Sequence, residues 1–399
     1  MTAPLVLRGA SLIDGTGAPP VRGRAVVVEN GRIADVVEES RAPAGTTLRL
    51  DGLTLLPGLF NCHVHLSFGG EPDPSVALRS DSYAMTVIKA ALRARQTVEA
   101  GVTTVRDLGG RDYAELAVRD AVRAGLILGP RILCAGRGIC MTGGHGWQLI
   151  GREADGADEV RKAVREQLRA GADVVKIFAT GGVMTPGVDP NSAQLTLDEV
   201  RAAIEEARKA GRRVAAHAQG ADGIANCLEA GITTIEHGIF LSEALCRRMT
   251  GDGVALVPTL IAAAAIERGG IAAGIPEFAV KKSVALTDRH RESFRLAVRL
   301  GVAIAAGTDA GTPLNPHGSI VPELSLMVRA GLAPLEAIRA ATSTAARVCG
   351  LEAETGRVVP GLAADLLAVG GDPMEKIEAI DDVRLVLARG VVVVNRLAA

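Results

Sequence analysis

Short apolar segments alternate with longer amphipathic segments through the middle of the chain, between residues 57 and 357. The short segments are rich in Val, Ile, Leu and Ala, which is typical of buried parallel strands. Eight strands are expected, over residues 58–63, 103–107, 131–135, 173–178, 214–217, 233–237, 255–258 and 303–307. Helices are expected between them, for example over residues 84–100, 157–170, 197–210 and 288–300. This alternation predicts an α/β fold with a parallel sheet, and eight repeats favour closure into a (β/α)8 TIM barrel.

The two ends of the chain have a different pattern, with short β-branched segments separated by turns. Asn30-Gly31 lies between two such segments, and this pair is a strong signal for a β-hairpin. Arg389-Gly390 marks a similar turn near the C-terminus. We therefore expect one small β-sandwich domain built from both termini, residues 1–56 plus 358–399, beside a barrel domain of residues 57–357.

Composition narrows the classes of partner. The chain has 399 residues, with 44 Lys+Arg against 45 Asp+Glu and a net charge of -1. This balance argues against nucleic-acid and anionic-membrane partners, and 2% aromatic residues offer few platforms for stacking bases. The longest apolar run, residues 254–266, is interrupted by Pro258 and is too short for a membrane helix. We expect a cytoplasmic protein without a signal peptide, whose partner is a small molecule and whose six cysteines are reduced.

Two histidines end the first expected barrel strand, in His63-Val64-His65. Residues i and i+2 of a strand share a face, so both imidazoles can point at one metal ion. By itself an H-x-H pair is a weak signal, because most such pairs are not metal ligands.

Lys176 ends the fourth expected strand, inside the apolar run 174–178. Burial of an ammonium group there is costly unless the group is paired or chemically altered. One interpretation is a lysine that extends out of the barrel end into water. The other is a neutral amine that captures CO2 as a carbamate, whose two oxygens can bridge two cations.

Three more polar residues follow expected strands: His217 after the fifth, His237 after the sixth and Asp309 after the eighth. Each alone is compatible with a hydrogen-bonded residue at the barrel rim. With the H-x-H pair and Lys176, however, they all fall at the C-terminal ends of strands, where TIM barrels build active sites. Together they predict a metal site.

With this arrangement the sequence resembles the amidohydrolase superfamily over essentially the whole chain. The segments Pro-Gly-Leu-Phe-Asn-Cys-His-Val-His at 57–65 and Ala-Gly-Thr-Asp-Ala-Gly at 306–311 are similar to the binuclear branch that hydrolyses amides of amino acids. That branch includes prolidase-like Xaa-Pro dipeptidases, arginine and lysine carboxypeptidases, and ochratoxin-hydrolysing relatives. Asn61 departs from the family pattern, since many members have Asp there. We expect this difference to affect the fine tuning of the site rather than metal binding.

The resemblance implies two Zn²⁺ ions per chain, with Mn²⁺ or Co²⁺ as substitutes. Six side chains would hold the ions. His63, His65 and Asp309 would bind the more buried ion, and His217 and His237 would bind the second. A carbamate on Lys176 would bind both ions. A bridging hydroxide would attack the substrate, and Asp309 would act as general base. The resemblance further implies a homo-oligomer.

Residues on loops are candidates for substrate contacts. His145 lies in the glycine-rich segment 142–147, and by resemblance it binds or polarises the substrate carbonyl, although a surface loop histidine is the alternative. His317, after the eighth strand, is a second candidate. Tyr113, Arg137 and Arg152 are candidates for binding a substrate carboxylate, and the sequence does not choose among them.

The predicted function is a binuclear amidohydrolase that cleaves the amide or peptide bond of dipeptides or N-acyl amino acids. One alternative is a deaminase or an imidazolonepropionase-like cyclic amidohydrolase. Deaminases typically have a Glu three residues after the strand-five histidine, where this chain has Gly220. A lactonase or phosphotriesterase on the same barrel is a second alternative, and a scaffold that has lost its metals is a third.

Overall fold

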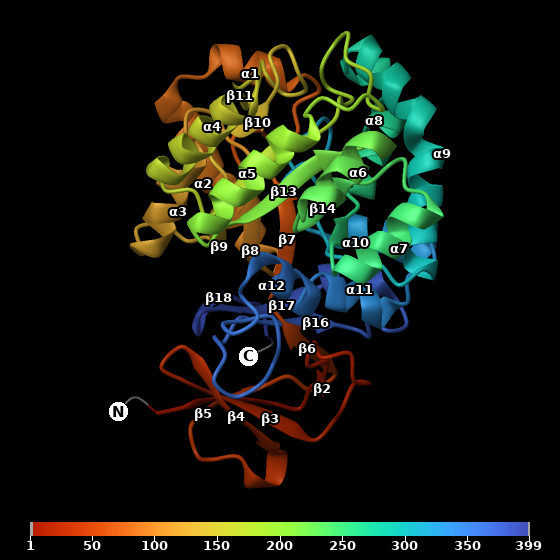
Figure 1. The fold of residues 1–399 in the computed structure, drawn as a ribbon. Helices are drawn as coiled ribbons and strands as arrows, with labels where there is room; N and C mark the ends of the chain where they lie inside the picture. The colour runs from red at the N-terminus through yellow and green to blue at the C-terminus, as the bar shows by residue number, and fades with distance from the viewer. Residues whose placement is uncertain (1–2, 398–399) are drawn as a thin grey trace.

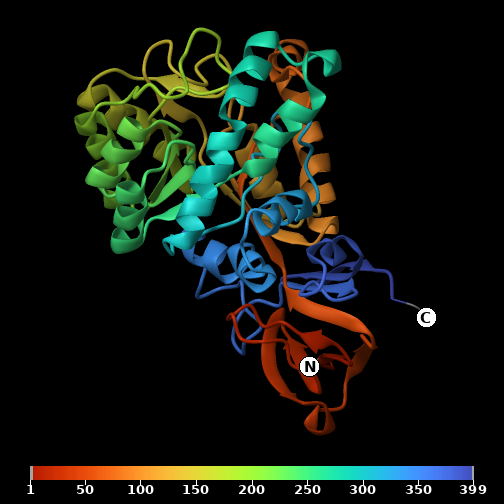
Figure 2. The same ribbon diagram turned by 90° about the vertical axis from the view of Figure 1, so that its right-hand side faces the viewer.

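Strands from the two ends of the chain gather at one end of the molecule, and most helices surround the other end (Figures 1 and 2). The computed structural model describes residues 3–397. The outermost residues of the predicted small domain, 1–2 and 398–399, lie outside the described residues.

The terminal strands form two sheets. Their bounds are β1 (Leu5–Arg8), β2 (Ser11–Leu12), β3 (Arg24–Glu29), β4 (Arg32–Glu38), β5 (Thr46–Arg49), β6 (Leu53–Pro57), β16 (Leu366–Gly370), β17 (Val383–Ala388) and β18 (Val391–Asn395). The strand orders are β4-β3-β1-β5 and β18-β17-β16-β6-β2. The second sheet joins both termini, because β6 pairs antiparallel with β16 and Pro57 lies opposite Leu366. Side chains of both sheets share one hydrophobic cluster, which includes Leu7, Val26, Leu55, Leu366 and Leu385.

The predicted hairpin between β3 and β4 is confirmed. Asn30 and Gly31 connect the two antiparallel strands with positive φ angles of 49° and 78°, as a tight hairpin turn requires. The six cysteines are free thiols, as the sequence predicted.

The middle of the chain contains parallel strands. Their bounds are β7 (Leu59–Val64), β8 (Val102–Asp107), β9 (Arg131–Cys134), β10 (Gly138–Cys140), β11 (Gly151–Glu153), β12 (Val174–Phe178), β13 (Arg213–Ala218), β14 (Thr234–His237) and β15 (Ala255–Val257). They form one sheet of order β7-β8-β9 and another of order β11-β10-β12-β13-β14-β15. The predicted α/β class with a parallel sheet is therefore confirmed.

The third predicted strand, 131–135, is part of a longer segment that is divided in two. β9 pairs with β8, and β10, which follows it, pairs with β12. Gly136 lies between β9 and β10 with a φ of 73°, a value that interrupts an extended strand. The segment therefore connects the two parallel sheets.

The prediction of an eighth strand over residues 303–307 is wrong. The structure has only an isolated β-bridge there, between Ile304 and Leu256. The segment still lies between β15 and β7, since Ala305 donates its N–H to Leu256 and the carbonyl of Ala306 accepts from Cys62. However, the N–H of Ala306 bonds to the carbonyl of Ala340 in a helix instead of to a strand. Its ladder is therefore too irregular for a strand.

Twelve α-helices occur within residues 3–397. They are α1 (Pro74–Ser80), α2 (Tyr83–Glu99), α3 (Ala114–Arg123), α4 (Ala157–Ala170), α5 (Leu197–Lys209), α6 (Ala221–Ala230), α7 (Glu243–Asp252), α8 (Leu260–Gly269), α9 (Glu277–Arg299), α10 (Val321–Arg329), α11 (Pro334–Ala340) and α12 (Ser343–Cys349). Short 3-10 helices span Glu39–Arg41, Ile271–Ala273 and Ile377–Asp381. In this described part of the chain, none of the helices combines the length and apolar character needed to cross a membrane.

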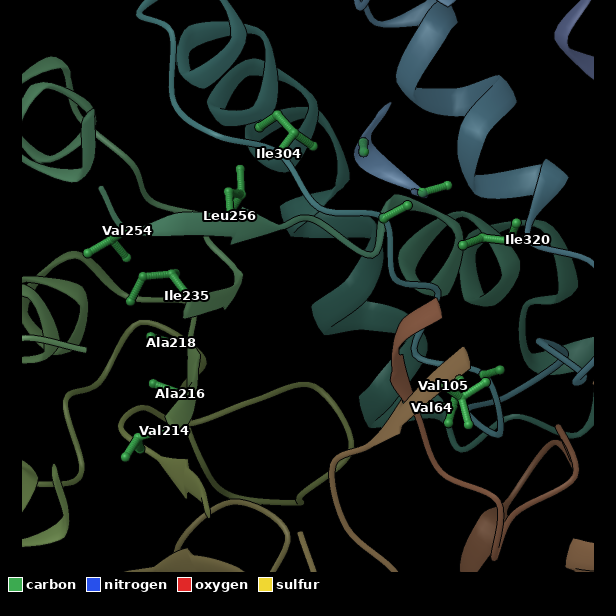
Figure 3. Close-up of a cluster of buried hydrophobic side chains, with 14 of the residues drawn as sticks. Val64, Val105, Val214, Ala216, Ala218, Ile235, Val254, Leu256, Ile304 and Ile320 are labelled. Carbon is green, nitrogen blue, oxygen red and sulfur yellow. The ribbon is translucent and has the colours of Figure 1, made fainter. Parts of the chain in front are cut away.

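Alternation along the parallel strands decides which side chains face the site. Val214, Ala216 and Ala218 of β13 belong to the main hydrophobic cluster together with Ile235 and Leu256 of the next strands (Figure 3). Successive strand residues point to opposite faces, so His217 points away from this cluster. Lys176 has the corresponding orientation in β12. Its neighbours Val175 and Ile177 belong to the cluster, so the Lys176 side chain also points away from it.

Candidate active site

A cavity lies at the C-terminal ends of the parallel strands. All six residues predicted to hold metal line it, and so does His145. These residues, of which His63 and Asp309 lie 246 positions apart in the sequence, thus meet at one place.

The tightest group in the cavity consists of His63, His65 and Asp309. Nε2 of His63 lies 3.3 Å and Nε2 of His65 lies 3.1 Å from Oδ1 of Asp309. One possible ligand atom from each residue lies within 4.8 Å of the others. Nδ1 of His65 bonds to the carbonyl of Gly109 at 2.8 Å, so its Nε2 is left to face Asp309. This is the pattern in which metal-binding histidines are usually held.

The sequence did not reveal what holds His63. Its Nδ1 lies 2.9 Å from Oε2 of Glu236, and Oε1 of Glu236 accepts from Arg106 at 2.8 Å. Glu236 and Arg106 are both buried. The only available signal was an acidic residue in the apolar strand before His237.

The other predicted ligands lie beside this group. The ring of His237 is 5.2 Å from that of His63 and 4.5 Å from that of His217, measured between centroids. Nδ1 of His237 lies 2.7 Å from the hydroxyl of Thr259, and Nε2 of His217 lies 2.9 Å from the carbonyl of Gly181. Each ring therefore keeps one nitrogen free of these contacts. Lys176 is 1% exposed and lines the same cavity.

Burial and neighbouring charges shift the pKa values of these groups. Burial by itself raises the pKa of the Asp309 carboxyl, but His63 and His65 outweigh burial and hold that pKa well below its usual range. Burial lowers the pKa of the Lys176 amine to about 8 and that of His237 to about 3. Burial, with Lys176 nearby, also lowers the pKa of His63. Burial also acts to lower the pKa of His65, but the hydrogen bond to Asp309 outweighs burial and raises that pKa. At neutral pH the cavity thus holds an ionised Asp309 with neutral His63 and His237, which suits the binding of cations.

Three residues with a strained backbone lie at this cavity. His237, Thr259 and Asp309 have positive φ angles of 72°, 52° and 58°, values that residues with a Cβ rarely adopt. All three line the cavity. Such strained positions tend to occur at functional sites, where the surrounding structure maintains them.

His145 is held from two sides. Its Nδ1 lies 2.9 Å from the hydroxyl of Thr185, and its N–H donates to Gln194 at 2.8 Å. Its ring centroid is 4.4 Å from that of His217. A Cβ at Gly182 would lie 2.4 Å from Nε2 of His145, so this loop position requires glycine. The surface-loop alternative for His145 is therefore wrong, since the residue is buried.

Other predicted substrate residues are not brought to the cavity. Tyr113 packs against Gly136 and the hydrophobic core, and it does not line the cavity. Nε2 of His317 bonds to the carbonyls of His65 and Phe68, at 3.2 and 2.9 Å, and also lies outside the lining. Both rings are engaged elsewhere in this structure, and a contact of Tyr113 or His317 with the substrate stays a prediction.

The two arginine candidates are likewise engaged elsewhere. Arg137 donates to the carbonyl of Gly151, and Arg152 forms an ion pair with Glu166 at 2.7 Å. Neither lines the cavity.

Asn61 has a structural role. Its Nδ2 donates to the hydroxyl of Thr308 at 2.7 Å, and its Oδ1 accepts from the N–H of Thr308 at 3.0 Å. Asn61 thereby fixes the segment that carries Asp309 beside β7.

Comparison with known proteins places this geometry among hydrolases. The model of the Amidohydrolase family matches residues 54–393. Ochratoxinase of Aspergillus niger is 33% identical to this chain, in an alignment that covers 96% of this chain and 84% of that protein. The crystal structure of a Xaa-Pro dipeptidase with methionine bound in its active site has a TM-score of 0.91 and 31% identity, covering 98% of this chain and 99% of that one. The crystal structure of A. niger ochratoxinase has a TM-score of 0.88, 31% identity and coverage of 99% and 96%.

Proposed function

This chain belongs to the amidohydrolase family, and on that premise we propose that it is a binuclear metal-dependent enzyme that hydrolyses the amide bond of small molecules. The resemblance to the prolidase and ochratoxinase group is confirmed. The observation that carries the proposal is the meeting of Nε2 of His63, Nε2 of His65 and Oδ1 of Asp309 in a cavity that Lys176 and two further histidines also line.

The donor atoms fit two divalent cations. His63, His65 and Asp309 would hold one ion, and His217 and His237 the other, because imidazole and carboxylate are ligands that Zn²⁺, Mn²⁺ and Co²⁺ accept. The contacts of the opposite ring nitrogens with Glu236, Gly109 and Thr259 support this assignment. When bound, two such ions would lower the pKa of a water molecule and polarise the substrate carbonyl.

Lys176 would carry a carbamate. Its pKa, lowered by burial to about 8, leaves part of the amine unprotonated near neutral pH. The amine nitrogen attacks the carbon of CO2, a C–N bond forms and one proton leaves. The resulting carboxylate replaces a buried ammonium group with an anion that can pair with both cations.

Asp309 would transfer the protons, and His145 would orient the substrate. Asp309 is ionised, so it can accept the proton of the attacking water and pass it to the nitrogen of the leaving amine. His145, held through Nδ1 by Thr185, would donate a hydrogen bond from Nε2 to the substrate carbonyl.

The same proposal includes the architecture and the assembly. Hydrogen bonds from 303–309 to both β15 and β7 support a closed (β/α)8 barrel of residues 57–357. The cluster shared by the two terminal sheets supports a β-sandwich of residues 1–56 and 358–399. A homo-oligomer, a cytoplasmic location and zinc as the native metal stay predictions.

The test is metal analysis combined with a substrate panel. We expect purified chain to contain two divalent ions and to hydrolyse Xaa-Pro dipeptides or N-acyl amino acids, with activity lost to a chelator and regained with Zn²⁺, Mn²⁺ or Co²⁺. Fewer than two ions after incubation with zinc, together with inert amides, would contradict the proposal. Release of ammonia from aminopurines with every amide inert would favour the deaminase alternative.

A further inference from the structure

Helix α8 begins in an unusual way. Thr259 stands at its N-cap, where a threonine usually has an extended backbone and accepts a hydrogen bond from an N–H of the first turn through its hydroxyl. Here Thr259 has a φ of 52° and a ψ of 42°, the left-handed region that β-branched residues rarely adopt. Its side chain accepts no capping bond from the described N–H groups of α8. The ordinary threonine cap is therefore not formed.

Glu323, on helix α10, caps α8 instead. Its Oε1 accepts from the N–H of Leu260 at 2.9 Å, and its Oε2 accepts from the N–H of Ile261 at 2.7 Å. Both N–H groups belong to the first turn of α8, where a helix has no partners of its own for them. Glu323 is fully buried, with 0% exposure. A carboxyl group from another helix thus fixes the start of α8 without the side chain of Thr259.

The hydroxyl of Thr259, which is not used for capping, contacts a candidate metal ligand. It lies 2.7 Å from Nδ1 of His237, and this contact leaves Nε2 of the same ring for a cation. Thr259 is 1% exposed and lines the cavity, so little water competes for its hydroxyl. The conformation of Thr259 therefore decides whether this hydroxyl meets His237 or the end of its own helix.

We propose that Glu323 is a positioning residue for His237: by capping α8 it keeps Thr259 in the left-handed conformation and leaves the Thr259 hydroxyl to hold the imidazole. Without the Glu323 carboxyl, two buried N–H groups would lose their partners, and the Thr259 hydroxyl would turn to cap the helix in the ordinary way. His237 would then lose the group that orients it. This inference rests on the proposed metal binding and specifies how one of the ligands is oriented.

Metal binding by the chain without substrate tests this role. Glu323→Gln keeps the size of the side chain, but its single carbonyl oxygen can accept from only one of the two N–H groups. In a titration of the metal-free chain with Zn²⁺ against a chelating dye, we expect the affinity for one of the two ions to fall about 10-fold or more, and that for the other ion to stay the same. Unchanged affinity for both ions would overturn the inference.

Ser82→Ala is the matched control. Ser82 caps α2 by accepting from the N–H of Met85 at 3.3 Å, and neither residue lines the cavity. The control also loses a helix cap, so its Tm should fall. Both zinc affinities should nevertheless stay those of the wild type. A fall in affinity equal to that of Glu323→Gln would mean that loss of any helix cap weakens the site, and it would contradict a specific role of Glu323.

Variants of Thr259 show whether Glu323 acts through this residue. Thr259→Val removes the hydroxyl and should weaken one ion about 10- to 100-fold, whereas Thr259→Ser keeps the hydroxyl and should retain most of the affinity. The double variant Glu323→Gln with Thr259→Val should bind zinc no more weakly than Thr259→Val alone, because the second change has no hydroxyl left to misplace. If the two fold-changes multiply instead, Glu323 acts independently of Thr259 and the inference fails.

Nitrogen NMR of the histidine rings separates this inference from the proposed function. In the metal-free wild type we expect His237, identified by comparison with His237→Gln, to carry its proton on Nδ1, where the Thr259 hydroxyl accepts it. In Glu323→Gln we expect a mixture of both tautomers. If the wild type binds fewer than two ions, the proposed function fails, and the spectra still decide the inference. A mixture in the variant alone supports it, and the same tautomer state in both proteins contradicts it.

Discussion

Nδ1 of His63 lies 2.9 Å from Oε2 of Glu236, a carboxyl group with no exposure to water. The other oxygen of that carboxyl accepts from Arg106, which is also buried. The orientation of a candidate metal ligand therefore depends on a buried ion pair that does not itself line the cavity. Because the pair is desolvated, removal of one partner leaves the other charge uncompensated.

Glu236→Gln should weaken both metal binding and the fold. We expect metal affinity to fall about 10- to 100-fold, the usual effect of losing the group that orients a ligating histidine. The free energy of unfolding should fall by about 3–5 kcal/mol, since Arg106 loses its counter-charge. Metal competition with a chelating dye and urea denaturation measure the two effects. Glu243→Gln, on an exposed pair with Arg247, is the control and should cost about 1 kcal/mol or less. Unchanged metal affinity in Glu236→Gln would show that this contact does not orient His63.

Asp309→Asn should separate proton transfer from folding. The amide can occupy the same space, but it cannot accept the proton of the attacking water. We expect the variant to keep the fold and much of the metal, as Tm and metal analysis should show, while kcat falls by about 10²- to 10⁴-fold. The exposed Asp158→Asn should leave all of these values unchanged. A kcat close to that of the wild type would exclude Asp309 as the general base.

Lys176→Ala should lose activity and metal together, because the bridging carboxylate can no longer form. Short carboxylic acids such as acetate or propionate should restore part of the activity by occupying the vacated space. Turnover and metal content, each measured with and without acid, test this expectation. Exposed Lys162→Ala is the control. A variant that keeps two metals and normal turnover would rule out the carbamate.

His290 should make the protein less stable in acid. Burial lowers its pKa to about 4, so the folded protein keeps it neutral while the unfolded chain protonates it near pH 6.5. Below pH 6.5 the unfolded state binds more protons, and the stability present above that pH is lost as the pH falls toward 4. By pH 5 this amounts to roughly 2 kcal/mol.

His290→Gln is the matching variant, since the amide can still donate to the carbonyl of His237, which Nε2 of His290 now approaches at 3.1 Å. Between pH 7.5 and pH 5, Tm should fall less in this variant than in the wild type. Equal falls in the two proteins would mean that His290 is not held neutral.

The positions of the candidate ligands could be predicted because strand geometry is local. His63, Lys176, His217 and His237 each fall within a parallel strand, where alternation decides which face a side chain takes. The α/β class followed from the same periodicity. The facing of these side chains and the α/β class both depend on residues that are neighbours in the sequence. The amino-acid pattern is therefore enough to predict them.

The features that the sequence did not predict depend on contacts between distant segments. Glu236 and Arg106 pair across 130 positions, and no local pattern marks a salt bridge of that kind. The segment 303–307 has the composition of a strand, but a hydrogen bond from Ala306 to Ala340 breaks its ladder. Tyr113 and His317 follow predicted strands, as site residues do, and only tertiary packing decides that neither residue lines the cavity.

The pairing of β6 with β16 has a consequence for biosynthesis. Pro57 finds its partner Leu366 only after the ribosome has added residues 58–366. At roughly 5–20 residues per second, that delay is on the order of 15–60 s. During this interval the nascent N-terminal strands have an open edge, so chaperones that shield such edges should govern the yield of native enzyme in the cell.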